Sequence, residues 1–390
     1  MGKNLKDYYW DKENKVPKYK IEIKEKGKER LAIERMPNYR RRRRFKLTEF
    51  KMNIINDVED DNFDPLVDKI MQLQSCYIEG PAGCGKTTLI NKIKEKITEK
   101  GESYLCLAPT NLAALLINGM TIHKYIAKTK KMSLLKNLSQ KYIFVDEISM
   151  VKEIFYKFLL MIKKMNSQIK FIISGDIKRQ LLPINDRAKF NYEDSIALKE
   201  LCNYNKLQLT KCRRSDSKVY DVCNFDTIMQ LDTEQFSHKQ TKKNICYTNK
   251  KRIQINDMLM NKYKKNNYVK INKRIGDPNS QTMYVYKNLP IIAKHTDDKI
   301  KLYNNEQYIV TNIDKNKIEV KSCVEQDKIL IFSQKDFAIN FNPAYCLTVH
   351  CSQGCTIKEP YTIHEFKKFS KRLRYTALSR ATKFEDINIL

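Results

Sequence analysis

The residues best suited to chemistry lie in one glycine-rich stretch, GPAGCGKT at positions 80–87. It fits the pattern of a phosphate-binding loop, in which backbone N–H groups and the N-terminus of the following helix bind phosphate oxygens. The chain has only 10 glycines in 390 residues, and three of them stand in this loop, which argues against a chance match in an ordinary turn. In this pattern the lysine reaches the β- and γ-phosphates, and the threonine hydroxyl binds Mg²⁺. We therefore predict an ATP and Mg²⁺ site whose nucleotide-binding residues are Gly80, Pro81, Ala82, Gly83, Cys84, Gly85, Lys86, Thr87 and Thr88.

Two carboxylates follow an apolar run further along the chain. Residues 142–145 have the composition of a buried strand, and Asp146 and Glu147 come directly after them. Because the carboxyl ends of parallel strands meet at one edge of a sheet, we expect both side chains beside the phosphate loop. Asp146 would hold Mg²⁺ through water, together with Thr87, and Glu147 would orient and deprotonate the attacking water. The alternative is an acidic strand end without a chemical role.

The elements that position these residues alternate between strands and helices. We predict strands at residues 76–79, 104–108, 142–145, 171–176 and 207–209, and helices at residues 47–58, 88–100 and 111–117. The last third repeats the pattern without a phosphate loop, with strands at residues 244–247, 344–349 and 386–390 and a helix that ends near residue 264. Residues 284–341 alternate apolar and polar side chains, which predicts a small antiparallel β insert. The predicted fold class is therefore α/β.

The composition indicates a globular chain with a polyanionic partner. Hydrophobic residues make up 42% of the sequence, enough to bury sizeable cores. The formal net charge is +29, and nucleic acid is the usual partner of such a basic chain. A compositional explanation stays open, because A+T-rich codons encode the abundant Lys, Asn, Ile and Tyr. Such residue usage is typical of a protist or a large DNA virus.

Cysteine usage and hydropathy predict an intracellular protein, either nuclear or cytoplasmic. The 11 cysteines are scattered singly, and the sequence contains neither a C-x-x-C pair nor a secretory signal, which favours a reducing compartment. Three of the cysteines lie near His350, but their spacing matches no standard zinc pattern. No apolar run approaches the length of about 18 residues that a membrane helix needs, so we expect no membrane partner.

The N-terminal 60 residues are polar and strongly charged, and five consecutive arginines occupy positions 40–44. This run suits a nucleic-acid contact or a nuclear localisation signal, and the third interpretation is a solvated arm without either role. We predict a partly disordered basic arm at residues 1–60, an ATP-binding domain at 61–225, and a second domain at 226–390 with the β insert at about 275–342.

The ordered series of motifs resembles that of superfamily I DNA helicases, most closely the Pif1, RecD and Dda group. The series covers roughly residues 75–390 and consists of GPAGCGKT, LAPTNLAA, TIHKY, FVDEISM, GDIKRQLLP, LTKCRRSD, CYTNKKRIQIN, LTVHCSQGCTI and YTALSRA. The resemblance implies two RecA-like P-loop NTPase domains with ATP in the cleft between them, and a small barrel related to Src-homology-three domains in the second. It further implies an ATP-dependent DNA helicase that moves from 5′ to 3′ on single-stranded DNA and unwinds forked duplexes in replication, repair or recombination.

The resemblance also assigns roles to individual residues. Those that would serve ATP hydrolysis are Lys86, Thr87, Asp146, Glu147, Gln180, Arg214 and Arg380, with Arg380 as the first candidate for an arginine finger. Those that would lie along the DNA strand are Pro109, Thr110, His123, Thr248, Thr348, His350 and Ser352. We expect the active unit to be a monomer. Three alternatives stay open: an RNA helicase, a nucleic-acid-stimulated translocase without strand separation, and a binding module that uses ATP as a switch.

The sequence departs from the family pattern in three features. Lys51 stands where the family carries a glutamine that reads adenine, one extra residue precedes Gln180, and the stretch between His123 and Asp146 is short. That stretch leaves little room for the hairpin that splits the duplex in related helicases. The resemblance therefore predicts translocation more firmly than unwinding.

Overall fold

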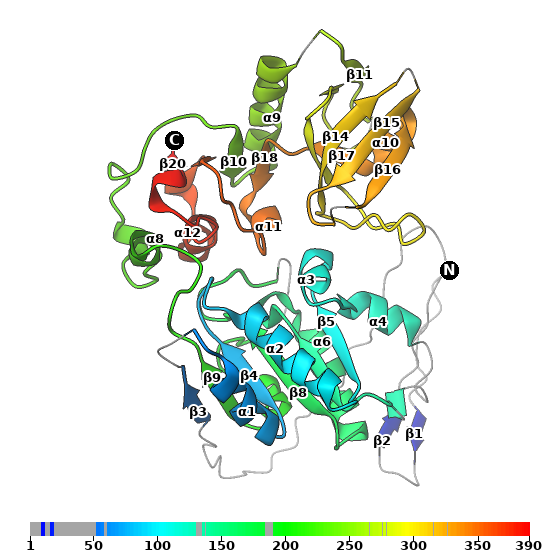
Figure 1. Ribbon diagram of the computed structural model, residues 1–390, viewed down its shortest axis with the longest axis vertical. Helices are drawn as coiled ribbons and strands as arrows, with labels where there is room; N and C mark the ends of the chain where they lie inside the picture. Colours follow the sequence, from blue (N-terminus) through cyan, green and yellow to red (C-terminus); the bar gives the residue numbers. More distant parts are fainter. Residues whose placement is uncertain are drawn as a thin grey trace.

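The structure is a computed structural model that describes residues 9–11, 16–18, 52–57, 61–129, 135–136, 138–183, 190–264, 266–274, 276–277, 279–314, 316–325 and 327–390. Figure 1 shows two α/β units, one above the other, with a β-rich insert beside the upper one. The arginine run at 40–44 and Lys51 lie outside the described residues. A separate pair of short antiparallel strands is formed by β1 (Tyr9–Asp11) and β2 (Val16–Lys18).

The lower unit is built on a parallel sheet of seven strands within the described residues. In spatial order the strands are β3 (Asn53–Asn56), β9 (Asn205–Gln208), β4 (Cys76–Glu79), β8 (Lys170–Gly175), β7 (Tyr142–Val145), β5 (Tyr104–Ala108) and β6 (Met120–Thr121). The strand β4, which precedes the glycine-rich loop, therefore lies inside the sheet between β9 and β8. The carboxyl ends of β4, β7 and β8 lie at one edge, as the sequence predicted.

Helices cover both faces of this sheet. One face carries α1 (Asp64–Gln72), α2 (Lys86–Glu99) and α3 (Asn111–Leu116), and the other carries α4 (Ile122–Lys128), α6 (Glu153–Met165) and α7 (Ile196–Leu201). Successive strand residues serve opposite faces, since Tyr77 packs in the core that holds α6 and Ile78 in the core that holds α2. Burial on both sides explains why these strands are almost continuously apolar in sequence.

The predicted helix over residues 47–58 is wrong where the structure describes it. Asn53–Asn56 is the edge strand β3, which pairs in parallel with Asn205–Gln208. Ile55 packs on the core, whereas Ile54 is 54% exposed, which is the alternation of a strand at an edge. Pairing with a strand about 150 residues away overrides the local helical pattern. The local sequence around residues 53–56 does not indicate that this strand is its partner.

The upper unit contains a second parallel sheet. Its four strands, in spatial order, are β18 (Cys346–Thr348), β10 (Lys243–Cys246), β19 (Tyr361–Ile363) and β20 (Ile387–Ile389). The helices of this part of the chain are α8 (Ser217–Val222), α9 (Asn249–Tyr263), α11 (Val349–Ser352) and α12 (Lys371–Leu378). Figure 1 shows α12 on the side of the upper unit that faces the lower one.

The insert consists of antiparallel strands, as predicted. A two-stranded pair is formed by β11 (Val269–Ile271) and β12 (Met283–Val285). The main sheet has the order β16 (Ile329–Ser333), β15 (Lys317–Ser322), β14 (Gln307–Ile313), β13 (Pro290–Ala293) and β17 (Phe341–Pro343). The helix α10 (Gln334–Asn340) was not predicted, although Ser333 and Asp336 form a capping signature before it. Closure of this sheet into a barrel remains a prediction.

The domain boundaries also remain predictions. The first sheet uses strands from residues 53–208 and the second from residues 243–389, so β3 begins before the predicted start at residue 61. In the part of the chain that the structure describes, every helix is too short or too polar to cross a bilayer.

Candidate nucleotide site

The glycine-rich loop joins the buried strand β4 to the N-terminus of α2, as the phosphate-binding pattern requires. Gly83 and Gly85 have positive φ angles of 80° and 91°, which favour glycine. A Cβ atom at Gly85 would lie only 2.7 Å from the Phe63 ring, and one at Gly83 would lie 3.0 Å from Arg214. Both glycines are therefore required by backbone conformation and by close packing. The loop leads directly into the N-terminus of a 14-residue helix, where the helix dipole favours a phosphate.

Lys86 begins this helix and is buried inside the loop. Its Nζ donates hydrogen bonds to the carbonyls of Gly80 at 2.7 Å and Pro81 at 2.9 Å. Burial disfavours the ammonium charge, but the neighbouring Cys84 thiol and nearby carboxylates, led by Asp176, raise its pKa above the ordinary value. Lys86 is therefore positively charged, as a phosphate-binding lysine must be.

Asp146 follows β7 and lies opposite the end of β4. Its Oδ1 accepts hydrogen bonds from the Glu147 N–H at 2.9 Å and from the Ser174 hydroxyl, while Thr87 Oγ1 lies 3.5 Å from its Oδ2. Burial raises the pKa of Asp146. A hydroxyl and a carboxylate whose oxygens lie 3.5 Å apart match the few oxygen ligands by which proteins hold Mg²⁺ alongside substrate phosphates. The donor set therefore fits the predicted ion.

Glu147 combines strained backbone with an unused carboxylate oxygen. Its φ angle is 52°, in the left-handed region, and its Oε2 is buried without a hydrogen-bond partner among the described residues. Burial, followed by the charge of Asp146, raises the pKa of Glu147 to about 7. A carboxylate with this pKa is suited to accept a proton from water near neutral pH.

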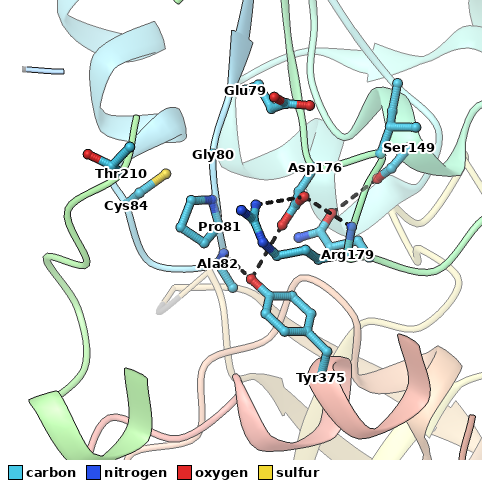
Figure 2. Close-up of polar contacts among 12 residues, drawn as sticks. Glu79, Gly80, Pro81, Ala82, Cys84, Ser149, Asp176, Arg179, Thr210 and Tyr375 are labelled. Carbon is cyan, nitrogen blue, oxygen red and sulfur yellow. Dashed lines mark hydrogen bonds and ion pairs between the residues drawn. The ribbon is translucent and has the colours of Figure 1, made fainter. Parts of the chain in front are cut away.

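The side chain of Gln180 forms its hydrogen bond with Ser149, not with the phosphate loop, Asp146 or Glu147. Its Oε1 accepts a hydrogen bond from Ser149 Oγ at 3.1 Å, and its backbone N–H donates to the Asp176 carbonyl at 3.0 Å. Asp176 in turn forms an ion pair with Arg179 at 3.3 Å (Figure 2). Gln180 thus belongs to a polar group with Ser149, Asp176 and Arg179, and its role toward the γ-phosphate remains a prediction.

Arg214 and Arg380 meet at one residue, Ser379. Arg214 Nη2 donates to the Ser379 carbonyl, and Arg380 Nη2 donates to Ser379 Oγ at 3.0 Å. Arg380 is further fixed by its Nε, which donates to the Thr376 carbonyl at 2.8 Å. Burial, together with the nearby Arg380 charge, lowers the pKa of Arg214. Arg214 also packs against Gly83 of the phosphate loop, whereas Arg380 is held within the second unit by the carbonyls of Thr376 and Cys355.

A cavity of about 190 Å³ lies between the phosphate loop, Arg214 and the C-terminal end of α12. Its lining includes Pro81, Ala82, Arg179, Arg214, Tyr375 and Ser379. The sequence pointed to Arg214 in this wall, but it did not single out Tyr375, although Tyr375 opens the YTALSRA motif. Ser149, Ser174 and Asp176 were also missed, although Ser149 and Asp176 lie within two of the motifs and Ser174 lies near the end of a predicted strand.

Three of the residues predicted to contact DNA lie at helix N-termini. The hydroxyls of Thr110, Thr248 and Thr348 cap α3, α9 and α11, each accepting a backbone N–H. Such caps place amides and hydroxyls where phosphates bind. His350 is half-buried on α11, and burial lowers its pKa, which leaves the imidazole neutral near pH 7.

The remaining predicted DNA residues differ in exposure, from the exposed His123 to the buried Ser352. The His123 ring stacks edge-on against Phe155 with centroids 4.6 Å apart. Ser352 is 1% exposed, and its hydroxyl donates to the Val349 carbonyl at 2.8 Å. Pro109 directly precedes the cap of α3 and is partly exposed. DNA contacts by all of these residues remain predictions.

Fold and site together define a P-loop NTPase with two parallel-sheet units and a nucleotide cleft between them. A family model described as an AAA domain matches residues 65–185. An ATP-dependent DNA helicase Pif1 from Campylobacter jejuni is 25% identical, over 84% of this chain and 91% of that protein.

Two solved structures share the fold. The Pif1 helicase of Candida albicans has a TM-score of 0.65 and 18% identity, with coverage of 86% of this chain and 94% of that one. The Bacteroides Pif1 helicase in complex with ADP-AlF3 and single-stranded DNA has a TM-score of 0.59 and 19% identity, covering 85% and 92%. In sequence and fold the chain therefore resembles the Pif1-like superfamily I helicases. This confirms the resemblance seen in its motifs and the α/β class with two RecA-like domains.

Proposed function

We propose that this protein is an ATP-dependent DNA helicase that moves on single-stranded DNA by opening and closing the cleft between its two RecA-like units. The observation that carries the proposal is the meeting of Arg214 and Arg380 at Ser379, beside the phosphate loop. Because one arginine follows the first sheet and the other follows α12, a nucleotide bound between them would hold both units together. Hydrolysis would remove that link and let the units separate.

The residues of the site have the chemistry for γ-phosphate hydrolysis. Lys86 would exchange its loop carbonyls for phosphate oxygens, and Thr87 with Asp146 would hold Mg²⁺, which neutralises charge on the phosphates when bound. Glu147 would accept a proton as the water oxygen bonds to the γ-phosphorus and the bond to the β-phosphate oxygen breaks. The products are ADP and inorganic phosphate. Arg214 and Arg380 would stabilise the negative charge that spreads over the transferred group.

Single-stranded DNA is the proposed track. Phosphates of the strand would bind at the capping hydroxyls, which are those of Thr110 on the first unit and of Thr248 and Thr348 on the second. Such contacts do not depend on the base sequence. Opening or closing of the cleft would change the distance between the phosphate contacts of the first unit and those of the second, and this would move the protein along the strand. The resemblance supports movement from 5′ to 3′, and the short stretch before Asp146 makes strand separation the step most in need of testing.

One experiment tests the proposal directly. ATP hydrolysis is measured without nucleic acid, with single-stranded DNA and with single-stranded RNA, beside unwinding of forks that carry only a 5′ or only a 3′ tail. We expect strong stimulation by DNA and separation of the 5′-tailed fork alone. Stimulation without separation would indicate a translocase, greater stimulation by RNA would indicate an RNA helicase, and no stimulation by either would indicate an ATP switch.

The same chain supplies both sides of the cleft, which supports a monomer as the unit of ATP hydrolysis. Light scattering of the protein on a short DNA strand tests this. Participation in DNA replication, repair or recombination, in the nucleus or cytoplasm, remains a prediction.

A further inference from the structure

The hydroxyl of Tyr375 bridges two loops of the first unit from the second. It accepts a hydrogen bond from the Ala82 backbone N–H at 2.8 Å and donates one to Asp176 Oδ2 at 3.3 Å (Figure 2). Tyr375 belongs to α12 and is 2% exposed. A hydroxyl can accept and donate through the same oxygen, so this one atom satisfies an amide of the phosphate loop and a buried carboxylate together.

A second residue of α12 holds the same region of the first unit. The Arg372 guanidinium donates to the carbonyls of Ile177 and Gln180, each at 2.6 Å, and forms an ion pair with Glu193 at 2.8 Å. The helix is therefore attached along the segment from Asp176 to Gln180. Tyr375 is the attachment that also reaches the phosphate loop.

The other end of α12 leads to the paired arginines. The Ser379 N–H donates to the Tyr375 carbonyl at 3.0 Å, one helical turn away. Ser379 is the residue at which Arg214 and Arg380 meet. A single turn of hydrogen-bonded backbone thus separates the phosphate-loop contact from the residue that binds both arginines. Displacement of one end of this turn moves the other.

We propose that Tyr375 is a positioning residue for ATP hydrolysis, whose hydroxyl fixes α12 against Ala82 and Asp176 and thereby sets the distance of Arg380 and Arg214 from the phosphate loop. The inference rests on the proposed function. Of the predicted nucleotide-binding residues this hydroxyl contacts Ala82, through its backbone N–H, but in the hydrogen bonds described it contacts neither Lys86 nor Thr87. We therefore expect its removal to act on turnover while Lys86 and Thr87 still bind the nucleotide. The Tyr375 ring, which packs edge-on against Phe225 with centroids 6.0 Å apart, stays buried in the phenylalanine variant.

The test compares Tyr375→Phe with a matched control in the full chain. In Tyr361→Phe a buried hydroxyl is also lost, and that hydroxyl donates to the carbonyls of Ala377 and Leu378 in the same helix but does not cross the cleft. We expect Tyr375→Phe to lower the kcat of DNA-stimulated ATP hydrolysis about 10- to 100-fold with KM for ATP unchanged. Tyr361→Phe should keep kcat, and thermal melting should show similar small losses for both variants.

The Arg380→Ala background separates positioning from a general structural role. Under single-turnover conditions with enzyme in excess, adding Tyr375→Phe to Arg380→Ala should not lower the rate of ATP hydrolysis further, because the guanidinium that Tyr375 positions has already been removed. A wild-type kcat in Tyr375→Phe, or the same fold-loss in both backgrounds, would overturn the inference. Failure of the proposed function would look different, since the wild-type protein itself would then show no DNA-stimulated hydrolysis.

Discussion

The hydroxyl and the backbone N–H of Thr248 both donate hydrogen bonds to the carboxylate of Glu365, at 3.1 Å and 2.9 Å. Tyr247 adds its N–H at 3.1 Å. Burial alone would raise the pKa of Glu365, but these hydrogen bonds outweigh it and the pKa lies below the ordinary value. A stable carboxylate therefore occupies the N-terminus of α9, where the sequence predicted a DNA phosphate.

Replacing Glu365 with glutamine should tighten binding of single-stranded DNA. The substitution removes a negative charge beside the predicted phosphate path, and one charge at a helix terminus changes affinity by up to about fivefold at low salt. Fluorescence anisotropy over a salt series measures the effect, which should shrink as salt rises. Glu359→Gln is the control, because Glu359 pairs with Lys243 at the opposite end of β10. Weaker DNA binding by Glu365→Gln would mean that the carboxylate serves to orient Thr248.

Lys86→Ala should lower kcat for ATP about 100-fold or more, the usual effect of removing one electrostatic contact to a developing charge. Lys94→Ala is a matched control on the same helix. Lys94 is also buried, but its Nζ donates to the Ile117 carbonyl at 2.7 Å, away from the phosphate loop. Steady-state hydrolysis with single-stranded DNA checks both variants. Equal losses in the two would point to a damaged helix.

Arg380→Ala should keep ATP binding and lose turnover by about 1,000-fold or more, as expected for an arginine finger. The control is Arg374→Ala, which removes another buried guanidinium from α12, one that donates to the carbonyls of Ile228 and Met229. Binding of a fluorescent nucleotide and single-turnover hydrolysis separate the two effects. Unchanged turnover in Arg380→Ala would end the assignment of Arg380 to this role and leave Arg214 as the candidate.

The raised pKa of Glu147 predicts two opposite pH effects. Because a base must be ionised, kcat/KM for ATP should rise with pH through about 7 and level off above it. For stability the sign reverses, since a folded-state pKa above the ordinary value means that ionisation is less favourable in the folded protein. Glu147→Gln should therefore lack hydrolysis but melt at a higher temperature than wild type above about pH 7. This difference should shrink as the pH falls toward 4.5, the ordinary pKa of the group.

Sequence reasoning succeeded where a feature is local. The phosphate loop, the acidic end of β7 and most strands of both sheets depend on neighbours within a few residues, and the structure shows them where predicted. It failed where the partner is distant, as with β3, whose strand conformation depends on β9. Tyr375 belongs to the same class, because its hydroxyl meets an amide 293 residues earlier in the chain. No pattern of residue types around position 375 specifies that contact.

The strand order of the first sheet has a consequence for synthesis of the chain. The strand β4 ends at Glu79, but its two sheet neighbours, β8 and β9, begin only at Lys170 and Asn205. A ribosome that adds about 5–20 residues per second therefore needs at least several seconds to supply the first of them. During that interval the apolar strand has no backbone partner on either edge. The nascent protein thus carries an aggregation-prone segment that a holding chaperone would protect until the second half of the sheet emerges.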